Sequence, residues 1–158
     1  MFKADNSLIG SSTDGITSGN SSGGGSIGNF IIGLNPDILN NASKEYILVT
    51  MYHEAPHAYL SLKWAQLGEA AFQIQFQGLT VNGGRLLAVQ YKDHWSMGYG
   101  TYVNGLRDAI LAFNSGFDPV RATALAECGI IVLNSAKSGI NNQERDTSEP
   151  GYMGTKCP

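Results

Sequence analysis

The chain has 158 residues, of which 42% are hydrophobic and only 15% are charged. This length suits one domain with a single core. The formal net charge of −3 leaves no basic surplus for binding phosphates, which argues against nucleic acid as the main partner. No stretch approaches the ~18 apolar residues of a membrane helix, so we expect no membrane span.

Composition gives a weaker indication of location. The first ten residues lack the apolar centre of a signal peptide. Abundant Gly, Ser and Asn nevertheless favour an exported protein, or part of a longer exported one, over a cytoplasmic one. The cysteines, Cys128 and Cys157, match no zinc or redox spacing, and whether they pair stays open.

Three regions differ in composition. Residues 1–28 are rich in Gly and Ser and predict a flexible arm, because they cannot bury enough apolar surface to offset the entropy of ordering. We expect the folded domain over residues 29–138. Residues 139–158 are polar and predict an irregular C-terminal tail.

The first half of the domain predicts a strand at 29–34 and then a long, apolar helix over about 44–67. Ser43 is the expected N-cap of this helix and Gly68 its expected end. Residues 71–77 alternate between apolar and polar side chains, which predicts a strand.

The second half begins with Asn82-Gly83-Gly84, which predicts a hairpin turn leading into a partner strand at 85–91. Helices are expected over about 96–113 and 119–136. Asp118-Pro119 is a strong start for the last one, with Asp as cap and Pro at the first helical position. The order of elements indicates an α+β fold.

The motif that carries chemistry is His53-Glu54-Ala55-Pro56-His57, an H-E-x-x-H pattern inside the long helix. Histidines four positions apart lie on one face, so both imidazoles can reach one zinc ion. Glu54 can then take a proton from a water whose pKa zinc lowers to ~7. The alternative is a metal-free structural domain whose histidines are satisfied by hydrogen bonds, although burying these side chains without a purpose is costly.

A catalytic zinc site needs a third protein ligand. His94, the remaining histidine, falls at the expected junction of a strand and a helix and is the favoured candidate. Glu127, the charged residue in an otherwise apolar run, is the competitor, or an acceptor for a histidine N–H. Tyr99, Tyr102 and Arg85 are candidate hydrogen-bond donors to an oxyanion.

Residues 50–60 (TMYHEAPHAYL) resemble the active-site helix of small bacterial zincins related to SprT-like metallopeptidases. Residues 93–97 (DHWSM), followed by Tyr102-Val103, resemble the stretch that carries their third histidine. Asp118 and the run at 124–126 resemble the start of their last helix. The resemblance spans residues 29–135 approximately.

This resemblance implies a zincin-like fold, in which the active-site helix packs on a small sheet and two further helices follow. It implies zinc ligands His53, His57 and His94 with Glu54 as base. It also implies a peptide or protein substrate bound along an edge strand, here expected at residues 29–34.

Pro56 departs from the pattern of these enzymes. Proline removes the helical hydrogen bond to the Tyr52 carbonyl and crowds it, at a cost of ~3 kcal/mol in a helix interior. We therefore expect a kink between His53 and His57. The alternative functions are a zinc-binding but catalytically impaired binding or toxin-associated module, and a hydrolase of peptidoglycan amide bonds.

Overall fold

A computed structural model describes five stretches of the chain, residues 1–19, 30–75, 80–82, 85–87 and 99–157. The fold is α+β, as the sequence predicted. Its elements are β1 (Phe2–Ala4), the 3-10 helix η1 (Asn6–Leu8), β2 (Gly15–Gly19), β3 (Phe30–Leu34), α1 (Pro36–Asn41), α2 (Lys44–Gln75), β4 (Thr80–Asn82), β5 (Arg85–Leu87), α3 (Tyr99–Phe113), α4 (Pro119–Glu127) and α5 (Ser135–Arg145).

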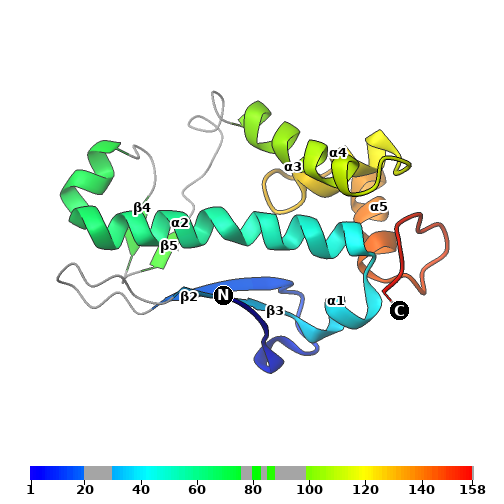
Figure 1. Ribbon diagram of the computed structural model, residues 1–158, viewed down its shortest axis with the longest axis horizontal. Coiled ribbons are helices and arrows are strands. Elements are labelled where there is room, and N and C mark those ends of the chain that lie inside the picture. Colours follow the sequence, from blue (N-terminus) through cyan, green and yellow to red (C-terminus); the bar gives the residue numbers. More distant parts are fainter. Residues whose placement is uncertain (20–29, 76–79, 83–84, 88–98, 158) are drawn as a thin grey trace.

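The main sheet has three strands in the order β1-β3-β2. β1 runs parallel to β3, and β2 runs antiparallel to it with Thr17 opposite Ile32. The long helix α2 lies between this sheet and the helices α3 and α4 (Figure 1). The expected strand at 29–34 therefore exists as β3, but it is central. The expectation that it forms the edge was wrong, because β1 and β2 cover its two sides.

These outer strands overturn the expected flexible arm for residues 1–19. The Asp5 N–H donates to the Leu34 carbonyl, and the Asn35 side chain donates to the carbonyls of Ser11 and Thr13. Pairing with β3 gives hydrogen-bond partners to main-chain N–H and C=O groups that would face water in a flexible arm. A prediction from composition does not include this pairing. Residues 20–28 of the expected arm lie outside the described residues.

The helix α2 begins as predicted, with the Ser43 hydroxyl accepting a hydrogen bond from the Tyr46 N–H. The expected break at Gly68 is also present, since this glycine adopts φ +74°. Beyond it, however, the chain returns to helix until Gln75. The predicted strand at 71–77 was thus wrong for residues 71–75, where Phe72 is completely buried.

The predicted hairpin forms between β4 and β5, with Asn82 opposite Arg85. Its first strand is Thr80–Asn82 rather than the expected 71–77. The expected second strand begins at Arg85 as predicted, and residues 88–91 lie outside the described part. Figure 1 shows this hairpin beside the middle of α2.

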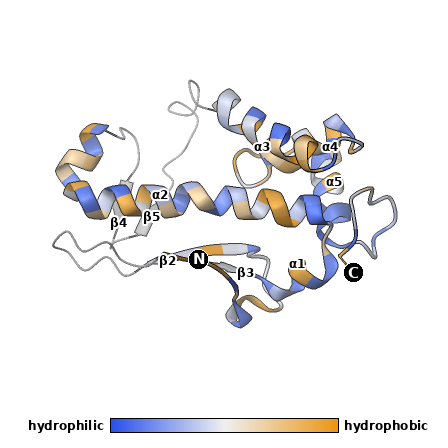
Figure 2. Cartoon of the chain, in the orientation of Figure 1, coloured by the Kyte–Doolittle hydropathy of each residue, from blue (hydrophilic) through white to orange (hydrophobic). Residues whose placement is uncertain are grey.

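The main core lies where α2 meets α1, α3 and α4. Figure 2 shows hydrophobic residues in the first half of α2 opposite hydrophobic parts of α3 and α4. Its buried members come from all four helices, the junction of α1 and α2, and the loop before α4: Ile38, Ala42, Tyr46, Val49, Val103, Leu106, Ile110, Phe117, Ala122, Leu125 and Ala126. This packing fixes the position of α2.

The single helix predicted over residues 119–136 is replaced by α4 and the start of α5. Asp118 caps α4 as expected, accepting from the N–H groups of Val120 and Arg121. The helix ends at Glu127 rather than near 136, because Gly129 turns the chain with φ +75°.

The expected irregular tail at 139–158 was also wrong in large part. α5 continues to Arg145, and residues 153–155 return to the start of α2. Two fully buried carboxylates fix this return. Glu45 accepts from the N–H of Thr155, and Glu144 accepts from the N–H groups of Met153 and Gly154.

None of the described helices combines the length and apolar character that crossing a membrane requires.

Candidate metal centre

The helix α2 brings three side chains of the H-E-x-x-H motif together. The ligand atoms of His53, Glu54 and His57 all lie within 4.8 Å of one another. The two imidazole rings stand 5.3 Å apart, centre to centre, at an angle of 60°. The one-turn spacing of the histidines on one helix face produces this proximity.

Pro56 does not produce the expected kink. Helical backbone angles continue through it, and Gly68 has the non-helical angles within α2. The carbonyl of Tyr52, which loses its donor to the proline, accepts a hydrogen bond from the Tyr102 hydroxyl at 3.3 Å. The two histidines therefore keep the relation of an uninterrupted helix.

His53 is half-buried, and its Nδ1 is buried without a hydrogen-bond partner among the described residues. Burial lowers the pKa of this imidazole, the nearby His57 lowers it further, and Glu54 opposes both. Its ring also lies against the main chain of Gly129. A neutral imidazole with an unused nitrogen has the properties of a metal ligand.

Glu54 is only 8% exposed and is fixed by β2. The Thr17 hydroxyl lies 2.9 Å from Oε2 of Glu54 and 3.1 Å from its main-chain oxygen. Gly15 approaches so closely that a Cβ there would lie 2.8 Å from the Glu54 Cγ. The carboxylate therefore has one orientation set by a neighbouring strand.

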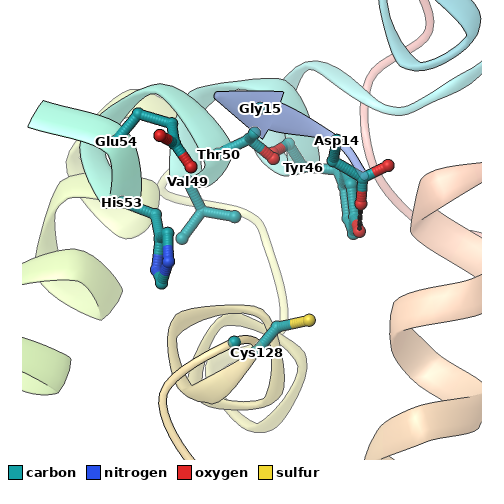
Figure 3. Close-up of a pocket in the computed structure, with 9 residues that line it drawn as sticks. Asp14, Gly15, Tyr46, Val49, Thr50, His53, Glu54 and Cys128 are labelled. Atoms are coloured by element: carbon teal, nitrogen blue, oxygen red, sulfur yellow. Dashed lines mark hydrogen bonds between the residues drawn. The ribbon is translucent and has the colours of Figure 1, made fainter. Parts of the chain in front are cut away.

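A cavity of about 180 Å³ is lined by His53 and Glu54 of the motif, and His57 is not among its lining residues. In Figure 3, His53 points toward the segment carrying Cys128, whereas the Glu54 carboxylate lies on the side of Gly15. Asp14 lines the cavity farther along, where it accepts a hydrogen bond from Tyr46. Burial and the Asp14 charge raise the pKa of Tyr46.

The other predicted site residues are distributed differently. His94 lies outside the described residues, and the side chains of Tyr99 and Arg85 are not described. Glu127 pairs with Lys137 and is not part of the group formed by the H-E-x-x-H side chains.

Tyr102 lies close to the motif, as expected, but its hydroxyl contacts the helix backbone. Burial first and the Glu54 charge second raise the pKa of Tyr102 to about 12. Its phenol is therefore protonated, and it acts as a hydrogen-bond donor, at neutral pH.

The two cysteines are both free thiols. Cys128 follows the last residue of α4 and is half-buried, and burial raises the pKa of its thiol. Among the described residues, neither cysteine belongs to a metal-binding group.

Sequence reasoning missed Asp14, Gly15, Thr17 and Gly129 as neighbours of the motif. The first three fall in the region predicted to be flexible. The β-branched pair Ile16-Thr17 is a weak signal for a strand within that region. No sequence pattern indicated that Gly129 lies near His53, because this contact depends on how α4 packs against α2.

The three motif side chains, His53, Glu54 and His57, offer ligand atoms of the kinds that zinc binds. Zinc binds imidazole nitrogen and carboxylate oxygen at ~2.0–2.2 Å in a tetrahedral arrangement, so two ligand atoms on one ion are ~3.3–3.6 Å apart. The ligand atoms of His53, Glu54 and His57 lie within 4.8 Å of one another, so two side chains that share one zinc ion would approach each other by up to ~1.5 Å. The donor types suit a zinc ion, and His53 and His57 offer the two imidazole nitrogens that could hold it from α2.

Comparisons with protein-family models, with curated proteins and with solved structures found no match.

Proposed function

We propose that this protein is a zinc-dependent hydrolase that cleaves peptide bonds. In this proposal His53 and His57 bind the ion from α2, His94 provides the third ligand, and Glu54 is the general base. The zincin-like character of the fold is part of the same proposal. The observation that carries it is the clustering of two imidazoles and a carboxylate with their ligand atoms within 4.8 Å.

The state of His53 supports metal binding. A buried polar atom without a partner costs free energy, and Nδ1 of His53 has no partner among the described residues. The lowered pKa keeps the ring neutral, which leaves a lone pair for a metal. Both facts agree with a ligand role.

Glu54 has the surroundings of a general base. A zinc ion bound here would polarise a scissile carbonyl and lower the pKa of water to ~7. Glu54 would accept a proton on its carboxylate and return it to the leaving amine. The Thr17 hydrogen bond holds the carboxylate in place and uses only part of its capacity to accept hydrogen bonds.

The substrate in this proposal is an extended peptide or protein segment. β2 pairs with β3 on one side, and among the described strands nothing pairs with its other side. Because Thr17 of β2 contacts Glu54, a peptide added along that side passes near the proposed base. This strand replaces residues 29–34 as the proposed substrate edge.

Zinc content and peptide cleavage test the proposal. We expect one zinc per chain by elemental analysis, and cleavage of an unfolded protein that a chelator stops. Glu54→Gln should retain zinc and lose at least ~100-fold in kcat, the usual contribution of a general base. Glu69→Gln, at an exposed position of the same helix, is the matched control and should keep full activity.

Ligand variants test the metal site itself. His53→Ala and His57→Ala should each abolish stoichiometric zinc, and His94→Ala should do the same if it is the third ligand. A purified wild-type chain that takes up no zinc would refute the proposal. If the His94→Ala variant still binds one zinc ion per chain, a residue other than His94 is the third ligand.

A second candidate function is a zinc-binding module without turnover. The observation that favours it is the 8% exposure of Glu54, whose carboxylate is already bonded to β2. This alternative predicts stoichiometric zinc, no cleavage of unfolded protein, peptides or peptidoglycan, and no functional effect of Glu54→Gln beyond zinc affinity.

A further inference from the structure

The H-E-x-x-H turn contains a local defect in its hydrogen bonding. In an α-helix the N–H of residue 56 donates to the carbonyl of residue 52, but Pro56 has no N–H. The same proline ring crowds that carbonyl. This defect lies between the two histidines, yet the backbone stays helical there.

The missing donor is supplied from another helix. Tyr102 lies on α3, 50 positions away from Tyr52, and its hydroxyl donates to the Tyr52 carbonyl at 3.3 Å. The Tyr102 ring packs against the main core, next to the buried Val103. The donor is therefore fixed by the packing of α3 on α2.

We propose that Tyr102 is a positioning residue for the metal-binding turn. Its hydroxyl replaces the helical donor that Pro56 removes and so keeps His53 and His57 on one face of α2. The part that concerns metal affinity rests on the proposed function. The part that concerns the helix does not, since it follows from the Tyr102–Tyr52 hydrogen bond and the proline alone.

Two further observations agree with this role. The pKa of Tyr102 is raised to about 12, so the hydroxyl is a donor at neutral pH. The main cause is burial, and the second is the charge of Glu54, which places Tyr102 close to the motif. A freely exposed tyrosine would show neither feature.

A double-mutant cycle tests the proposal on the full chain. The variants are Tyr102→Phe, Pro56→Ala and the combination, since alanine restores the N–H that donates to the Tyr52 carbonyl. Each is measured by urea unfolding without zinc, and by competition for zinc chloride against a chelating dye. Tyr52→Phe is the control, because it removes a hydroxyl from the same turn and keeps the carbonyl.

With Pro56 present, Tyr102→Phe should lower the folding equilibrium constant about five-fold, as expected for one net hydrogen bond, and weaken zinc binding by a similar factor. In the Pro56→Ala background both effects should fall below about two-fold, because the helix again satisfies its own carbonyl. Tyr52→Phe should change neither quantity.

Equal effects of Tyr102→Phe in the two backgrounds, or no effect in either, would overturn the proposal and reduce Tyr102 to a packing residue. If the wild-type chain binds no zinc, the proposed function fails separately. The unfolding measurements then decide the role of Tyr102 by themselves.

Discussion

The hydroxyl of Thr17 lies 2.9 Å from Oε2 of Glu54, although 37 positions separate the two residues. Thr17 belongs to β2 and Glu54 to α2, so this bond ties the sheet to the helix at the proposed catalytic group. A charge-assisted hydrogen bond of this kind contributes more than a neutral one.

Replacement of Thr17 by valine should therefore impair catalysis and spare the metal. Valine keeps the β-branched shape and removes the donor, so we expect kcat/KM for peptide cleavage to fall about ten-fold, or ~1.4 kcal/mol. Zinc content should be unchanged, as measured by elemental analysis. Thr17→Ser, which keeps the hydroxyl, should retain most activity. A fully active valine variant would show that β2 does not orient Glu54.

Gly129→Ala should weaken zinc binding through His53. The alanine Cβ would lie 3.1 Å from Cε1 of His53, and the residue would adopt φ +75°. Gly10 has the same φ but nothing within 4 Å of a Cβ, so Gly10→Ala is the control for backbone strain. Both variants should lose ~1–2 kcal/mol in unfolding free energy. Dye competition should show lower zinc affinity for Gly129→Ala alone, and equal affinities would contradict the ring contact.

The buried ion pair of Arg121 and Glu144 should be important for stability. Glu144 has a fully buried side chain, and Arg121 is its cationic partner. Arg121→Met leaves a buried carboxylate without that charge and should cost ~3–5 kcal/mol in urea unfolding. The exposed pair of Arg107 and Asp108 is the control, and Arg107→Met should cost at most ~1 kcal/mol. Similar losses in the two variants would contradict this difference.

Stability of the zinc-free protein should fall on acidification because of His53. Its pKa is lowered in the folded state, so below the ordinary value of 6.5 the unfolded chain binds more protons. The contribution of His53 is complete above pH 6.5 and is lost as the pH falls toward the folded-state pKa. Urea unfolding with chelator from pH 8 to pH 5 should show this slope, and His53→Gln should flatten it. If the unfolding free energy of His53→Gln falls with pH as steeply as that of the wild type, titratable groups other than His53 cause the loss of stability.

Local geometry explains the features that could be predicted from the sequence. His53, Glu54 and His57 come together because a helix repeats every 3.6 residues, whatever surrounds it. Asp118 caps α4 and Asn82 opposes Arg85 in a hairpin for equally local reasons. The kink expected from Pro56 is absent, and the Tyr52 carbonyl accepts a hydrogen bond from Tyr102 on α3, a donor that a local rule does not include.

Distant segments complete the site, and their positions became known only from the tertiary structure. Composition predicted that residues 1–19 would be unstructured, but β3 offers main-chain hydrogen bonds on both sides, and β1 and β2 use them. Thr17 reaches the motif from β2, and Tyr102 reaches it from α3, which packs on the other side of α2 (Figure 1). Such contacts depend on packing between elements far apart in the chain, which no local pattern encodes.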